Sequence, residues 1–188
     1  MDFILSAGGN QIKLWDLDGN HIGTFAGHST TIWNAEISKD GKYAISSAFN
    51  KTFILWDVYN GVVSKYMRAH NDITLAVSFS PDNLYIASGS NDLTIKIWDL
   101  GSGEVIRTLP GPVQEIYEVV FSPAGRILAA GSRERNIRVY DYIAGKLVYL
   151  LKGHREAVRS LAFSPDGNYL VSASEDRTLI LWDPGNGD

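Results

Sequence analysis

The sequence has 188 residues, of which 45% are hydrophobic and 11% aromatic, so it is long and apolar enough to form a buried core and does not resemble a disordered chain. Its 17 basic and 21 acidic residues give a formal charge of −4, which supplies no general attraction to nucleic acid or to an anionic membrane. The absence of cysteine excludes disulfides, thiolate metal sites and a cysteine nucleophile. Because neither a leader-like start nor an apolar stretch of about 20 residues occurs, we expect a soluble, cytoplasmic protein.

The first residues predict three short strands, at 3–6, 11–15 and 22–25. Further along the chain, short apolar blocks continue to alternate with turn residues such as Pro81-Asp82-Asn83, and the blocks lie too close together for a helix. We therefore expect four-stranded antiparallel units throughout. The predicted units are 1–26 with three strands, 27–68, 69–110, 111–152, and 153–188 without its last strand.

Two pairs of residues recur along the chain with one period. An aromatic residue followed by Asp closes the third strand of each unit, at separations of 41, 42, 42 and 42 residues. These pairs are Trp15-Asp16, Trp56-Asp57, Trp98-Asp99, Tyr140-Asp141 and Trp182-Asp183. The second set is Gly27-His28, Ala69-His70, Gly111-Pro112 and Gly153-His154. A period of about 40 to 45 residues with four strands is the size of one propeller blade, and such sheets must stack to cover their apolar faces.

With its Gly-His and Trp-Asp pairs, and with stretches such as residues 161–183, the chain resembles a WD-repeat β-propeller over essentially its whole length. The resemblance implies an all-β fold, a β-propeller built from four-stranded antiparallel WD-type blades. It is specific for the fold and says little about function, because this family serves many unrelated processes.

The resemblance also implies a hydrogen-bonded tetrad of His, Ser, Asp and Trp within a blade. The matching sets are His70, Ser88, Asp92 and Trp98; His154, Ser172, Asp176 and Trp182; and His28, Ser46, Asn50 and Trp56, in which an amide replaces the carboxylate. We expect blade 27–68 to be weaker for that reason. Blade 111–152 has Pro112, Ala130, Glu134 and Tyr140 at these positions, and we expect it to rely on packing.

The sequence predicts no catalytic, metal or cofactor site. The Ser, His and Asp set recurs in separate blades and ends on a tryptophan, which favours architecture over a nucleophilic triad. The four histidines never approach the spacing of a zinc site, and the glycines match no phosphate-binding loop. We therefore expect a protein that is not an enzyme and uses no cofactor.

The resemblance places partner-binding residues on the loops before the innermost strand and between the second and third strands. The bulge of the innermost strand would carry Trp33, Leu75, Tyr117 and Arg159, and the residue before the tetrad acid would be Phe49, Asn91, Arg133 and Glu175. We predict Trp33, Phe49, Leu75, Tyr117, Arg133 and Arg159 as the partner-binding set. Alternatively, the aromatic residues pack between blades. A basic cluster comprises Arg126, Arg133, Arg135 and Arg138. It is either a site for an acidic peptide or a phosphate group, or a solvated strand face whose charge Glu134 balances.

The predicted strands amount to about four and a half blades, too few for a ring of seven or eight. The chain could close a small ring of four, belong to a longer protein, or pair with a second copy. We favour a non-catalytic scaffold for protein or peptide partners, completed as a homodimer of eight or nine blades that binds no nucleic acid and no membrane. The alternatives are a propeller module of a larger signalling or enzyme-linked protein, or an engineered repeat protein without a natural partner.

Overall fold

The computed structural model describes residues 3–68, 70–185 and 187 of the chain. The described residues form 18 strands in five antiparallel sheets, and no helix, and therefore no helix able to cross a membrane, occurs among them. Ala69 of the second recurring pair and residues 1–2, 186 and 188 of the predicted end units lie outside the described residues. The prediction of an all-β, multi-blade fold is confirmed.

Each sheet is one meander, and the five are named here in chain order. The N-terminal blade contains β1 (Ile4–Gly8), β2 (Gln11–Trp15) and β3 (His21–Ala26). Blade 1 contains β4 (Ile32–Ile37), β5 (Tyr43–Ala48), β6 (Thr52–Asp57) and β7 (Val62–Arg68). Blade 2 contains β8 (Thr74–Phe79), β9 (Tyr85–Ser90), β10 (Ile95–Asp99) and β11 (Val105–Leu109). Blade 3 contains β12 (Ile116–Phe121), β13 (Ile127–Ser132), β14 (Ile137–Asp141) and β15 (Lys146–Leu151). Blade 4 contains β16 (Val158–Phe163), β17 (Leu170–Ser174) and β18 (Leu179–Trp182).

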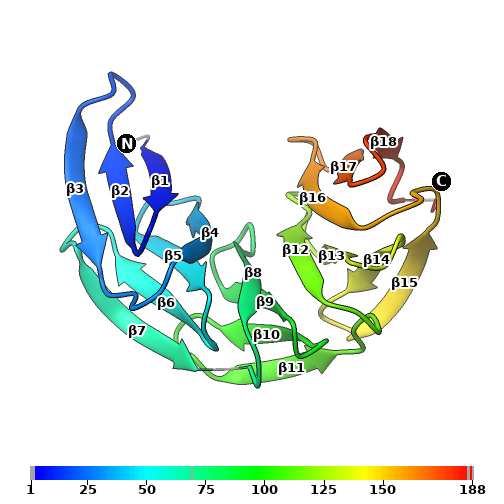
Figure 1. Ribbon diagram of the computed structural model, residues 1–188, viewed down its shortest axis with the longest axis horizontal. Coiled ribbons are helices and arrows are strands. Elements are labelled where there is room, and N and C mark those ends of the chain that lie inside the picture. Colours follow the sequence, from blue (N-terminus) through cyan, green and yellow to red (C-terminus); the bar gives the residue numbers. More distant parts are fainter. Residues whose placement is uncertain (1–2, 69, 186, 188) are drawn as a thin grey trace.

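The blades fan out into a crescent with the two incomplete blades at its ends (Figure 1). β4, β8, β12 and β16 lie on the concave side, and β3, β7, β11 and β15 lie on the outer rim. β3 pairs with β2 and not with β18, so no ring of four blades closes within the chain. The ring is incomplete, as the sequence predicts.

The hairpins between the first and second strands form because Ser and Asp side chains replace backbone partners in the turn. In blade 1 the Ser38 hydroxyl donates to Asp40 (2.8 Å) and accepts the backbone N–H of Tyr43 (2.9 Å). The same contacts recur at Ser80 and Ser164 in blades 2 and 4. These turns fix the register in which apolar residues alternate across the sheets of blades 1, 2 and 4.

Most of the core lies between blades. In each interface the face that carries the third-strand aromatic, here called the tryptophan face, packs on the opposite face of the preceding blade, here called its trailing face. Between blades 2 and 3, for example, Ile95 and Ile97 of the trailing face pack with Tyr140 of the next tryptophan face. Both isoleucines are 0% exposed, and the burial of each contributes about 1.5–3 kcal/mol.

The two end blades each leave one such face uncovered. In blade 4, Leu179 and Leu181 are the equivalents of Ile95 and Ile97 of blade 2, yet they are 73% and 65% exposed. In the N-terminal blade the tryptophan face has no preceding blade, and Ile4 on it is 49% exposed. The crescent therefore ends in one trailing face and one tryptophan face.

The hydrogen-bonded tetrads of blades 2 and 4 are complete. Trp98 donates its indole N–H to Ser88 Oγ (2.9 Å), which lies 2.7 Å from His70 Nε2. Burial lowers the pKa of His70, which favours the neutral ring, and in the tautomer that carries its proton on Nδ1 the ring donates to Asp92 (3.0 Å). Blade 4 repeats the chain through Trp182, Ser172, His154 and Asp176. Each acid also accepts a backbone N–H of the preceding loop, which fixes that loop to the sheet.

In blade 1 the chain stops at the histidine. Trp56 and His28 both bond Ser46, at 2.8 and 2.7 Å, but the buried Nδ1 of His28 has no hydrogen-bond partner among the described residues. Asn50 instead accepts from the backbone and hydroxyl of Thr52. The N-terminal blade contains part of a tetrad that the sequence analysis does not assign: Trp15 donates its indole N–H to Ser6 Oγ (2.8 Å).

Blade 3 does not rely on packing alone, in contrast to the expectation from its four replaced residues. The fully buried Tyr140 donates its hydroxyl to the backbone carbonyl of Pro110 (2.7 Å). Glu134 forms an ion pair with Arg138 and accepts the backbone N–H of Val113 (2.9 Å). Different residues thus give the buried third-strand aromatic a hydrogen-bond partner and hold the same loop.

We predict that Asn50→Asp stabilises blade 1. A carboxylate at this position accepts the otherwise unpaired Nδ1–H of His28, as Asp92 does for His70, and the expected gain is about 1 kcal/mol in the free energy of unfolding measured by urea denaturation. The matched variant Asp92→Asn removes the same bond from blade 2 and is expected to cost about 1–3 kcal/mol. A less stable Asn50→Asp protein contradicts this account of the tetrad.

Candidate functional site

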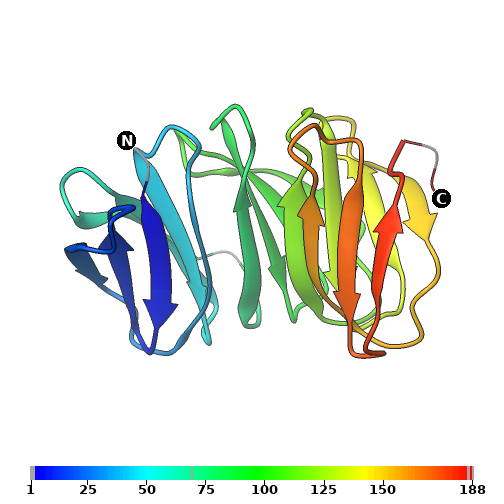
Figure 2. The same cartoon turned by 90° about the horizontal axis from the view of Figure 1, so that it is seen from above.

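The antiparallel topology gathers two sets of loops at one rim of the crescent. In a meander, the hairpin between the second and third strands and the connection to the next blade lie at the same end of the sheet. Viewed from above, the strands run between two rims of loops (Figure 2). We call the rim that holds the second-to-third-strand hairpins and the connections between blades the loop face. It contains the residues that the sequence predicts for partner binding.

Each innermost strand carries a bulge at its loop-face end. The register shifts fall at Ile32/Asn34, Thr74/Ala76, Ile116/Glu118 and Val158/Ser160. The residues inside these bulges are Trp33, Leu75, Tyr117 and Arg159, the four positions transferred from the family. A bulge leaves one residue out of the ladder and redirects its side chain, so every blade presents one residue that strand pairing does not constrain.

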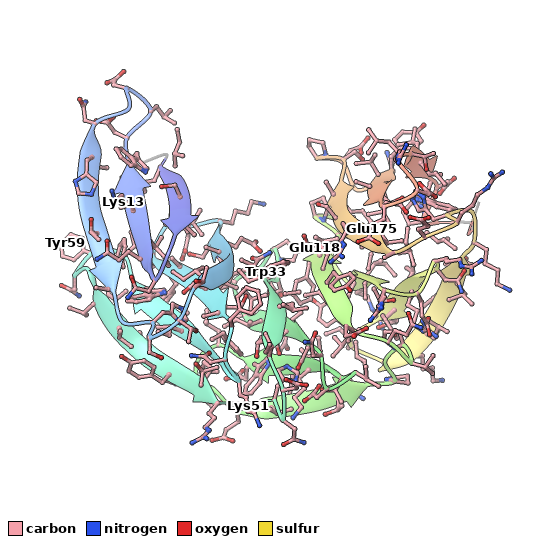
Figure 3. The ribbon with its side chains drawn as sticks, in the orientation of Figure 1. Lys13, Trp33, Lys51, Tyr59, Glu118 and Glu175 are labelled. Atoms are coloured by element: carbon pink, nitrogen blue, oxygen red, sulfur yellow. The ribbon has the colours of Figure 1, made fainter. Side chains whose placement is uncertain are left out.

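Trp33 and Phe49 form an exposed aromatic pair. Their ring centres lie 5.1 Å apart with planes at 86°, an edge-to-face contact, and the residues are 47% and 44% exposed. Phe49 lies in the hairpin between β5 and β6 and Trp33 in the bulge of β4, so the pair belongs to the loop face of blade 1. Trp33 lies toward the concave side (Figure 3). The alternative that these aromatics pack between blades therefore does not describe Trp33 or Phe49.

Tyr117 and Arg159 form a second contact, between blades 3 and 4. The guanidinium carbon of Arg159 lies 3.9 Å from the ring centre of Tyr117, and Arg159 also pairs with Glu175. Arg133 lies 3.2 Å from Glu115. These arginines are held by neighbouring groups while their charged ends remain accessible to a partner.

Leu75 differs from the other members of the predicted set. It is 5% exposed, so it offers little surface to a partner, and its carbonyl accepts the hydroxyl of Ser47 from blade 1 (3.1 Å). The basic cluster is also dispersed. Arg126 pairs with Asp141 and Arg138 with Glu134, so these two residues balance strand-face carboxylates instead of joining Arg133.

Two partly buried acids on the concave side, Glu36 and Glu118, are not singled out by the sequence analysis. Glu36 of β4 and Glu118 of β12 lie two blades apart and differ by two positions in the repeat register, and Asn34 links the two strands by donating to Glu118 (3.4 Å). Burial raises the pKa of Glu36 to about 7, and burial together with the Glu36 carboxylate raises the pKa of Glu118 to about 8. The only sequence signal is an acid where the other innermost strands have Ser, Ala, Val or Asn.

The tetrads offer no accessible nucleophile. Ser88 and Ser172 are buried, and the hydroxyl of each contacts a tryptophan N–H and a histidine. Within the described ranges, no group of three potential metal-binding His, Asp or Glu residues is found. The accessible chemistry of the site is aromatic and cationic surface on the loop face.

Comparison with known proteins matches this architecture. The family model for the WD domain, G-beta repeat, matches residues 19–57, 61–99, 103–141 and 145–183. The chain is 37% identical over 51 residues to eukaryotic translation initiation factor 3 subunit I of Schizosaccharomyces pombe, which covers 27% of the chain and 16% of that protein. It is 30% identical over 67 residues to the F-box-like/WD repeat-containing protein TBL1X of Mus musculus, 36% of the chain and 13% of that protein. It is 41% identical over 78 residues to the intraflagellar transport protein 122 homolog of Danio rerio, 41% of the chain and 6% of that protein.

The raised pKa values of the concave acids predict a pH-dependent stability. An acid with a higher pKa in the folded than in the unfolded state stabilises the fold fully below its unfolded pKa, and this contribution is lost as pH rises through the folded pKa. Between about pH 5 and pH 8.5 we expect the wild type to lose on the order of 1–2 kcal/mol more stability than Glu118→Gln, measured by urea denaturation. The exposed substitution Glu104→Gln serves as the control and should follow the wild type. Equal slopes for Glu118→Gln and wild type would exclude this role of Glu118.

Proposed function

Because this chain belongs to the WD40 repeat family, we propose that it is a non-catalytic scaffold that binds protein or peptide partners on its loop face. Proteins with WD repeats are in general interaction scaffolds. The chain spans only about a sixth or less of the curated relatives named above, so the roles indicated by their names are not transferred to it.

The exposed Trp33–Phe49 pair carries this proposal. Large aromatic side chains are costly to leave in water, and they are the residues that contribute most at protein interfaces. Tyr117 and Arg159 continue this surface on blades 3 and 4, and Arg133 adds a further charge contact. The set therefore combines apolar anchors with held cations, the composition typical of an interface centre.

We predict that the double variant Trp33→Ala/Phe49→Ala loses partners. Captured proteins from a lysate of the source organism are quantified by mass spectrometry with wild type and variants as bait, and we expect at least about a tenfold loss for specific partners. Tyr59→Ala is the matched control, because Tyr59 is 95% exposed on the outer side of the crescent (Figure 3). It lies in the hairpin between β6 and β7, at the end of blade 1 opposite the loop face. The free energy of unfolding should change by no more than about 0.5 kcal/mol in either variant. Equal capture by all three baits would rule out this surface.

We further propose that two copies of the chain complete the ring, giving a homodimer of eight or nine blades. The uncovered trailing face of blade 4 is apolar, like the trailing faces that blades 1 to 3 pack against the next blade. The uncovered tryptophan face of the N-terminal blade is of the same kind as the tryptophan faces that pack on those trailing faces. A head-to-tail pair related by a two-fold axis would cover both faces at two equal seams. If the chain is instead a module of a longer protein, further blades of that protein cover the same faces.

We predict a mass of two copies, twice 20.7 kDa, by sedimentation equilibrium across a dilution series. Leu179→Lys/Leu181→Lys places two charges on the trailing face and should reduce the mass to one copy, since burial of unpaired charge costs several kcal/mol. Leu84→Lys, at an exposed apolar residue of blade 2, should leave the dimer intact. A wild-type protein that remains a single copy at micromolar concentration refutes the dimer and favours the longer-protein alternative.

A further inference from the structure

A polar depression of about 540 Å³ lies on the loop face between blades 3 and 4. Residues 133–136, from the hairpin between β13 and β14, form one side, and residues 152–157, from the loop between β15 and β16, form the other. Gln114 and Glu175 complete the lining. The depression is thus built from the two kinds of loop that make the loop face.

The cations of this depression exceed its available carboxylates. Arg135, Lys152 and Arg155 form no ion pair among the described residues. Glu134 and Glu175 are already paired with Arg138 and Arg159, and Arg133 is paired with Glu115. Glu156 is the remaining carboxylate of the lining. In a protein of net charge −4, three unpaired cations around one depression create a local positive potential.

The fold itself does not require these cations. One repeat earlier, between blades 2 and 3, the equivalent positions are Leu93, Pro110 and Val113. Two repeats earlier, between blades 1 and 2, they are Lys51, Arg68 and Asn71. The three interfaces are built from equivalent strands and loops, and of the three only the one between blades 3 and 4 has a cation at all three positions, so the third cation meets no common structural need.

The replaced tetrad of blade 3 adds neutral donors to the same depression. In blades 1, 2 and 4 the residue two positions after the tetrad acid is a threonine that bonds this acid or its asparagine replacement, as Thr94 bonds Asp92 (2.6 Å). In blade 3 this residue is Asn136, whose amide has no hydrogen-bond partner in the described part of the chain. Asn136 lines the same depression as Arg135 and Gln114, so its amide adds a hydrogen-bonding group there.

We propose that this depression binds the anionic oxygens of a phosphorylated or acidic peptide segment of a protein partner. Two arginines, one lysine and free amide donors suit tetrahedral or planar oxyanions, because Arg presents paired N–H donors and charge-assisted hydrogen bonds are the strongest available. The inference rests on the proposed function in that the depression is part of the loop face. It does not use Trp33 or Phe49, so it can be tested without them.

The test is a fluorescence-anisotropy titration with a labelled peptide of alternating glycine and phosphoserine, and with glutamate and serine versions of it. We expect an anionic peptide to bind and the serine peptide not to bind, with Arg135→Ala/Lys152→Ala weakening the interaction about tenfold or more. The matched control is Lys51→Ala/Arg68→Ala, which removes the same charge at the equivalent positions 84 residues earlier and should change affinity by no more than about twofold.

Equal weakening by the two double variants, or equal binding of the serine and anionic peptides, overturns the proposal. Both variants remove exposed side chains, and unchanged urea midpoints verify that they fold. Trp33→Ala/Phe49→Ala is included as a third protein. If it loses lysate partners while it still binds the anionic peptide, the aromatic surface and the anion site are separate, and failure of either proposal leaves the other intact.

Discussion

Packing of one sheet face on the next is the constraint on which this structure depends. Each blade is apolar on both sides, and no blade can cover itself, so every tryptophan face needs a trailing face. The four buried clusters lie at these contacts. Blade 3 shows that packing ranks above the polar tetrad, since Tyr140 is fully buried there without the His and Ser of the other blades.

The polar chains solve a problem that this packing creates. An aromatic residue with an N–H or O–H group in an apolar interface must find an acceptor, because an unsatisfied buried donor costs about 1–3 kcal/mol. Blades 2 and 4 use a serine that passes the bond on to histidine and aspartate, whereas blade 3 uses the carbonyl of Pro110. The requirement is for a partner and a fixed loop, and the residue types that meet it can change together.

Sequence reasoning reached the features that are local or periodic. Turn residues and alternation located the strands, and the repeat register placed Trp33, Leu75, Tyr117 and Arg159 in bulges. It could not distinguish exposed Trp33 from buried Leu75, because burial at the same register depends on neighbouring blades. Glu36 and Glu118 meet only through the curvature of the crescent, which no short stretch encodes. The family repeat also begins just before the outermost strand of one blade and ends with the third strand of the next, so the sequence unit bridges two sheets.

The polarity of the interfaces has a consequence for how such a chain changes in evolution. Every interior junction joins the same two kinds of face, and the chain ends expose one of each. Duplication or loss of a DNA segment that encodes 42 residues therefore inserts or removes a whole blade and leaves both ends chemically unchanged. The number of blades can then vary by recombination within the gene, while each new copy inherits a bulge position whose side chain is free to diverge.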